Sequence, residues 1–116
     1  MNLTLIRGDS YLLTFALLDK AGNPYELTPL DKCYFTVKRK YSDVEYVLQR
    51  RLGEGISYNT ETQLYEIRLT PSCTCDIDCG GYVYDIKVKI ADEIAKTLVK
   101  GVLVLDSNVT HKVNEL

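Results

Sequence analysis

Apolar side chains recur at every second position along most of this 116-residue chain, and this period restricts the fold more than any other feature. Between residues 32 and 38, Cys33, Phe35 and Val37 alternate with polar residues, the pattern of a β-strand with one buried face. The alternation predicts seven or eight short strands, which include 3–5, 11–17, 32–38, 45–50, 65–69, 82–90 and 96–105, with at most one short helical turn within 71–80.

Turn-forming residues separate these strands at intervals of roughly 8 to 12 residues, which is typical of sandwiches and barrels. The sequence therefore predicts an all-β protein, a single antiparallel β-sandwich of the immunoglobulin-like type with seven or eight strands. A length of 116 residues fits one domain. We expect the sandwich to occupy residues 1–106, and residues 107–116 to form a C-terminal tail or edge extension.

Charge and hydropathy argue against several classes of partner. The 14 Lys and Arg are outnumbered by 16 Asp and Glu, and a net charge of −2 argues against nucleic-acid binding, which needs a basic surface. No apolar run approaches the roughly 18 residues of a membrane span, and the N-terminus lacks the pattern of a signal peptide. We expect a soluble domain made in the cytoplasm, without nucleic acid or membrane among its partners.

Few residues are suited to catalysis. The one histidine, His111, lies close to the C-terminus, where chains are usually poorly ordered. Asp76 and Asp78 resemble the start of a calcium loop, but position 87, where that loop needs a glutamate, is a lysine. Residues 7–9 spell Arg-Gly-Asp, which here is a turn between two strands. We expect no enzymatic activity, no catalytic residue, no metal ligand and no cofactor.

The four cysteines provide enough thiols for a structural zinc site, but their spacing does not fit one. Cys73, Cys75 and Cys79 lie close together, without the second pair of ligands that a zinc hook requires. Cys33 alternates with core residues and is expected to be buried. Buried or unreactive thiols are the favoured interpretation, and a disulfide or a thiol-bound metal remains the alternative.

Some apolar residues fall on the side of their strand that the alternation assigns to solvent. If Leu13 and Phe15 point inward, for example, Leu12 points outward. Strands that are apolar on both faces are covered by another layer or form an interface, although a bulge at Gly101 would reassign part of the last strand. We expect a protein-contact surface made of the outward apolar residues Leu12, Leu18, Val83, Leu98, Val102 and Val104, with Asp85 and Lys87 at its polar rim.

Four groups of residues follow one another along the chain, and their order can be compared with that in known protein families. A turn at Arg7-Gly8-Asp9-Ser10 precedes an alternating strand and a hairpin that contains Gly22-Asn23-Pro24. Three further groups come next: the strand 33–38, the element Gly81-Tyr82-Val83-Tyr84-Asp85-Ile86 after Thr70-Pro71, and the closing strand 101–105 with its tail Asn108-Val109-Thr110. Over about the whole chain, this order resembles the N-terminal domain of phage baseplate upper proteins.

The resemblance implies a β-sandwich that docks symmetrically within the tail or baseplate of a phage or prophage particle. Its partners would be other phage structural proteins and further copies of itself, and its location would be the virion, after synthesis in the cytoplasm of a bacterial host. Baseplate upper proteins continue into a longer stalk, whereas this chain stops at Leu116, which favours a small standalone particle protein. The cysteine-rich stretch departs from the family's turn, where Ile77 could supply the aliphatic anchor.

Two other functions fit parts of the sequence. A carbohydrate-binding or adhesin-like sandwich would use exposed tyrosines as its platform, although such platforms often contain tryptophan, which is absent here. A thiol-ligated metal protein would be built on Cys73, Cys75 and Cys79. The tyrosine candidates for the carbohydrate platform are Tyr25, Tyr34, Tyr41 and Tyr46.

Overall fold

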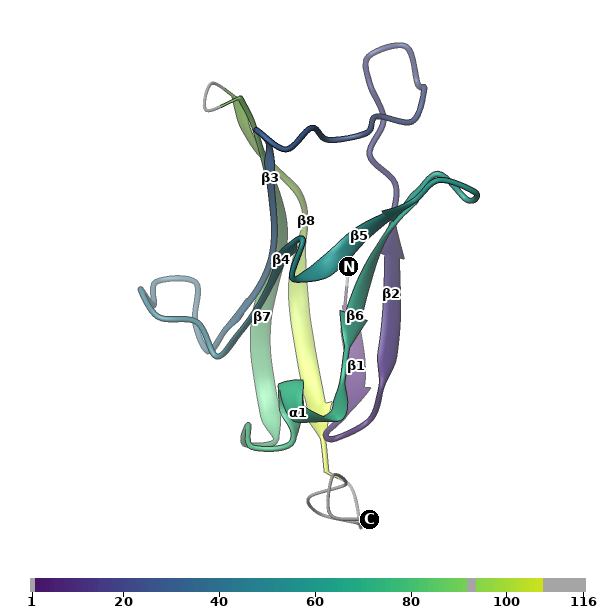
Figure 1. The fold of residues 1–116 in the computed structure, drawn as a ribbon. Helices are drawn as coiled ribbons and strands as arrows, with labels where there is room; N and C mark the ends of the chain where they lie inside the picture. Colours follow the sequence, from purple (N-terminus) through teal and green to yellow (C-terminus); the bar gives the residue numbers. More distant parts are fainter. Residues whose placement is uncertain (1, 92–93, 108–116) are drawn as a thin grey trace.

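A computed structural model describes residues 2–91 and 94–107. With 56% strand and 4% helix, it confirms the prediction of an all-β protein. The elements are β1 (Leu3–Ile6), β2 (Tyr11–Phe15), β3 (Lys32–Lys38), β4 (Leu48–Leu52), β5 (Gly55–Asn59), β6 (Leu64–Leu69), α1 (Pro71–Thr74), β7 (Gly80–Ile90) and β8 (Ile94–Asp106) (Figure 1). The alternation missed β5, because two glycines at its start mark the segment as a turn.

The eight strands form one sheet, in the order β1-β8-β7-β3-β4-β5-β6-β2. The sheet curls into a half-barrel, so that its inner face surrounds a single core (Figure 1). The prediction of a purely antiparallel arrangement is wrong, because β1 runs parallel to β8 and β4 runs parallel to β5. Strand direction depends on which segments pair across the sheet, and the alternation within a strand carries no information about that.

The core contains the apolar residues that the alternation assigns to the inner side of each strand. Phe35 and Tyr65 are completely buried, and Tyr65 stacks on Phe15 with ring centroids 5.1 Å apart. The Tyr65 hydroxyl accepts a hydrogen bond from the Leu27 amide and donates one to the Tyr25 carbonyl, both at 2.8 Å. Tyr65 therefore fixes part of the long connection between β2 and β3 to the core.

The pairing of β4 with β5 is the shortest among the described strands of the sheet. These strands share only two residue pairs, Arg51 with Gly55 and Leu52 with Ile56. Gly55 has a φ of 101°, and a Cβ atom at this position would lie 2.0 Å from Nε of Arg50. Glycine is favoured there because this φ strains any residue that has a Cβ atom, and a side chain would also require the Arg50 side chain to move.

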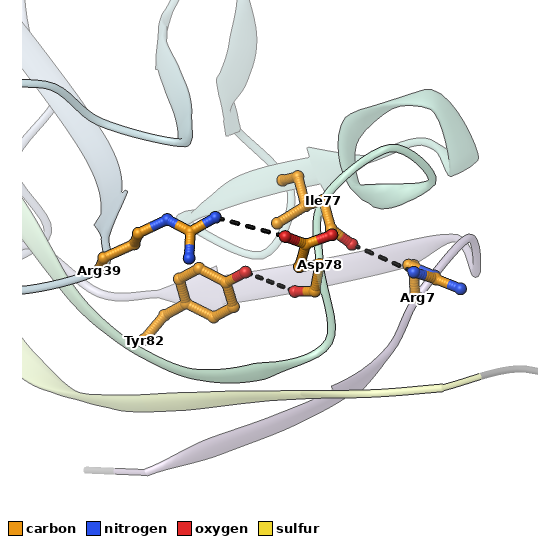
Figure 2. A network of polar contacts seen from close by, with 5 residues as sticks. All are labelled: Arg7, Arg39, Ile77, Asp78 and Tyr82. Carbon is orange, nitrogen blue, oxygen red and sulfur yellow. Dashed lines mark hydrogen bonds and ion pairs between the residues drawn. The ribbon is translucent and has the colours of Figure 1, made fainter.

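Residues 70–79, which include α1, lie at one end of the half-barrel (Figure 1), where Arg7, Arg39 and Tyr82 contact them (Figure 2). Ile77 packs against the core, and its carbonyl accepts a hydrogen bond from Nη1 of Arg7 at 3.4 Å. The Tyr82 hydroxyl donates to the Asp78 carbonyl. Nη2 of Arg39 lies 3.6 Å from Oδ2 of Asp78. The Arg39 guanidinium lies 5.9 Å from the centre of the Tyr82 ring. Three separate parts of the chain therefore hold this segment in place.

We predict that Tyr65→Phe lowers the free energy of unfolding by about 1–3 kcal/mol, because it leaves the Leu27 amide and the Tyr25 carbonyl without their buried partner. Urea denaturation followed by circular dichroism measures the change. The matched control is Tyr41→Phe, where the side chain is 62% exposed and little change is expected. Equal stability of the two variants would show that the Tyr65 hydroxyl does not hold the connection.

Candidate interaction face

Five of the eight predicted contact residues lie together on the outer side of β7 and β8. Tyr82, Tyr84 and Ile86 are buried, so the residues between them on β7 point away from the core. Across the ladder, Val83 pairs with Val102 and Asp85 pairs with Lys100. We call this surface the β7–β8 outer face, and it consists of Val83, Asp85, Lys87, Val102 and Val104.

The β7–β8 outer face is apolar toward the end where β8 finishes. Val102 is 42% exposed and Val104 37% exposed, and Ile6 of the adjacent strand β1 is 42% exposed. Val83 is half-buried, because it lines a shallow pocket of about 60 Å³ with Tyr41 and Asp85. Ile6 is not among the contact residues predicted from the sequence, although its position one residue after Leu5, which lies on the inward side of the strand, indicates an outward side chain.

The structure corrects the expected outward position of Leu98. The register of β7 and β8 shifts between Ile86, which faces Val99, and Lys87, which faces Thr97. Leu98 is the extra residue of this bulge, and both Leu98 and Val99 pack against the core. A bulge places two adjacent residues opposite one, so the alternation changes sides there. The bulge considered at Gly101 occurs three residues earlier in the chain.

Leu12 and Leu18 are exposed but do not join this face. Leu12, on β2, is 49% exposed, and Leu18 is 56% exposed in the connection after β2. Strand β2 is the last in the sheet, at the opposite edge from β1. The eight predicted residues therefore occupy three different places: the β7–β8 outer face, the β2 edge with the connection after it, and the core.

The thiols differ widely in exposure. Cys33 is 1% exposed, as expected of a core residue, and burial raises the pKa of its thiol to about 12. Cys75 is buried and Cys73 is partly buried, whereas Cys79 is exposed. All four are free, and among the described residues no three His, Cys, Asp or Glu side chains come together as metal ligands. His111 lies outside the described residues.

The four candidate tyrosines do not form one platform. Tyr41 and Tyr46 are 62% and 50% exposed in the connection between β3 and β4, and Nζ of Lys100 lies 5.7 Å from the centre of the Tyr41 ring. Tyr34 is half-buried on β3, and Tyr25 packs against the core. Tyr41 and Tyr46 are the most exposed of the four.

No protein-family model matches the chain, and no significant match was found among curated proteins. Within the described part of the chain, no helix is long and apolar enough to cross a membrane. The strand β8 ends at Asp106, and residues 108–116 of the predicted tail lie outside the described residues.

We predict that Leu98→Asp lowers the free energy of unfolding by about 2–4 kcal/mol, because it places a carboxylate against the core. Val102→Asp, on the exposed side of the same strand, should lower it by less than about 1 kcal/mol. Urea denaturation of both variants provides the comparison. If Leu98→Asp is as stable as Val102→Asp, the assignment of the bulge to Leu98 is wrong.

We predict that iodoacetamide at pH 8 modifies Cys79 and leaves Cys33 unmodified. Alkylation requires the thiolate, and both burial and a pKa near 12 suppress the thiolate of Cys33. Mass spectrometry of tryptic peptides, with and without urea, measures the two sites. Modification of Cys33 should begin only when urea unfolds the protein, and equal modification without urea would contradict its position in the core.

Proposed function

We propose that the chain is a structural subunit of a phage or prophage particle, a tail- or baseplate-type assembly module that acts through protein–protein contacts. The observation that carries the proposal is the apolar part of the β7–β8 outer face, with the exposed Ile6 beside it. Here a sheet that already has a buried inner face also presents aliphatic side chains on its outer face. Such a two-sided apolar sheet is typical of a surface that another protein covers.

The composition of this surface fits an assembly contact better than a ligand site. Val83 and Val102 face each other directly and form an aliphatic centre, while Asp85 and Lys87 provide polar groups at its border. The pocket beside Val83 holds only about 60 Å³, far below the size of a small-molecule site.

The resemblance to baseplate upper proteins supports the same function, with other particle proteins and further copies of this chain as partners and the virion as its location. The immunoglobulin-like sandwich belongs to this proposal too, since the two halves of the curled sheet enclose one core.

A carbohydrate-binding function is the second candidate, and the exposure of Tyr41 and Tyr46 favours it. A glycan array tests this candidate directly. Binding that is lost in the double variant Tyr41→Ala/Tyr46→Ala would replace the assembly proposal.

We predict that the protein forms discrete oligomers and that Val102→Asp/Val104→Asp makes it monomeric without unfolding it. Two carboxylates would be buried without partners in the contact, whereas in the monomer both positions are exposed. Light scattering behind size-exclusion chromatography measures the mass, with reductant and chelator as additional conditions.

The control is Val44→Asp, at a position that is 94% exposed on the connection between β3 and β4, which should leave the oligomer unchanged. Oligomers that persist in the double variant would show that the β7–β8 outer face is not the contact. Oligomers that dissociate with chelator or reductant would instead show that the cysteines carry it.

A further inference from the structure

Two arginine side chains line one pocket on the half of the sheet that contains β4, β5 and β6 (Figure 1). The pocket has a volume of about 290 Å³, and the polar side chains in its lining are Arg50, Ser57, Glu66 and Arg68. Ile67 is buried, so Glu66 and Arg68 on either side of it point to the outer side of β6. We call this the Arg50–Arg68 pocket. It combines guanidinium groups from β4 and β6, which are separated in the sheet by β5.

Gly55 allows the Arg50 guanidinium to lie close to Arg68. This guanidinium takes the place of a side chain at residue 55, since a Cβ atom there would lie 2.0 Å from Nε and 2.4 Å from Cζ of Arg50. Strands β5 and β6 are antiparallel, with Ser57 opposite Glu66. Two residues along the same register, position 55 is opposite position 68, and the Cβ atoms of such a pair lie about 5 Å apart. The two arginines therefore form a cross-strand pair of like charges.

The charges of this pair are not compensated by the residues that the structure describes. Within 2–91 and 94–107, Nε of Arg50 is buried without a hydrogen-bond partner, and neither Arg50 nor Arg68 forms an ion pair. Like charges opposite each other and a buried donor without a partner both raise the free energy of the folded protein. An anion bound between the two guanidinium groups would lower it.

The carboxylate in the lining, that of Glu66, is drawn away from the arginines. Its Oε2 accepts a hydrogen bond from Nδ2 of Asn59 at 3.3 Å. Asn59 lies on β5 four residues after Gly55, so this bond turns the carboxylate along the strand, away from the position that the Arg50 guanidinium occupies. The side of the pocket at Gly55 is therefore cationic.

We propose that the Arg50–Arg68 pocket binds a phosphate group, either as the free ion or as part of a small phosphate monoester. A guanidinium donates two parallel N–H bonds to an oxyanion, and a phosphate dianion has enough oxygens and charge to accept such bonds from both arginines. A carboxylate has only two oxygens and half that charge. The pocket volume is close to the lower end of the range for small-molecule sites, which leaves room beside the phosphate for a small organic group near Ser57.

This site is separate from the proposed assembly surface, because none of the residues that line the Arg50–Arg68 pocket belongs to the β7–β8 outer face. Each proposal can therefore fail while the other holds. The mass of Val102→Asp/Val104→Asp tests the assembly surface, and phosphate binding tests the pocket.

The probe is inorganic phosphate, added to the full chain at constant ionic strength and at about pH 7, where much of it is dianionic. An NMR titration that follows backbone amides and arginine Nε–H groups measures the affinity and locates the contact. Glycerol 3-phosphate, acetate and chloride are compared under the same conditions. We expect shifts concentrated at Arg50, Arg68 and the neighbouring residues of β5, and binding about tenfold tighter than that of acetate or chloride.

The comparison of the two phosphates identifies the source of the group. Tighter binding of glycerol 3-phosphate would support the proposal with a phosphate monoester as the ligand. Equal or weaker binding of the ester would support it with the free ion as the ligand. Acetate or chloride binding as tightly as phosphate would overturn it, because the pocket would then attract any anion.

The variant Arg68→Gln removes one cation of the pair at an exposed position and should weaken phosphate binding about tenfold. The matched control is Arg51→Gln, which removes the same charge from the residue after Arg50. Arg51 does not line the pocket and lies 3.9 Å from Glu54, so this variant should bind phosphate as the unmodified protein does.

The variant Glu66→Gln removes the carboxylate from the lining and should tighten phosphate binding, since it removes a repulsion. Unchanged binding in Arg68→Gln, an equal loss in Arg51→Gln, or the absence of phosphate-dependent shifts at both Arg50 and Arg68 would overturn the proposal.

Discussion

The turn at residues 7–10 imposes the constraint on which the rest of the structure depends, because it connects the two edge strands of the sheet. Five residue steps from Ile6 to Tyr11 span at most about 18 Å. In a flat sheet of eight strands, the edges would be about 34 Å apart. The sheet must therefore curl. Gly8 makes the turn possible with a φ of 83°, and its amide donates to Oγ1 of Thr74 at 2.9 Å, which ties the turn to α1.

The curl explains both the core and its opening. It brings Phe35 and Tyr65, from opposite halves of the sheet, into one core. However, the two edges are held together only near the turn, where Tyr11 reaches Ile6. Farther along, β8 extends nine residues beyond its pairing with β1, and the half-barrel stays open. An all-β chain that leaves strand edges exposed must protect or use them. In this protein the Tyr11 hydroxyl and the Asn2 side chain accept hydrogen bonds from two amides at the edge, those of Ile6 and Val102.

The assignment of inward and outward side chains from the sequence succeeded on the predicted strands whose alternation is regular. On β3 and on most of β7, the alternation assigned inward and outward residues correctly, since an extended backbone turns each side chain to the opposite face from the one before. This placed Val83 and Asp85 on the outer side. Leu98 was assigned wrongly, because one extra residue at the bulge reverses the alternation. The cavity of about 460 Å³ inside the curled sheet could not be predicted, because its lining comes from strands at both ends and in the middle of the sheet and no local pattern relates them.

The sequence by itself determined the class of secondary structure, the buried face of most strands and the positions of the main turns. These properties depend on residues close together in the chain, through side-chain alternation and the backbone preferences of glycine and proline. The tertiary structure alone decided the strand order, the two parallel pairings, the single curled sheet and the cavity inside it. Those features depend on pairing between distant segments, such as Leu3 with Leu103, and the free energy of such a pair depends on every other strand being in place.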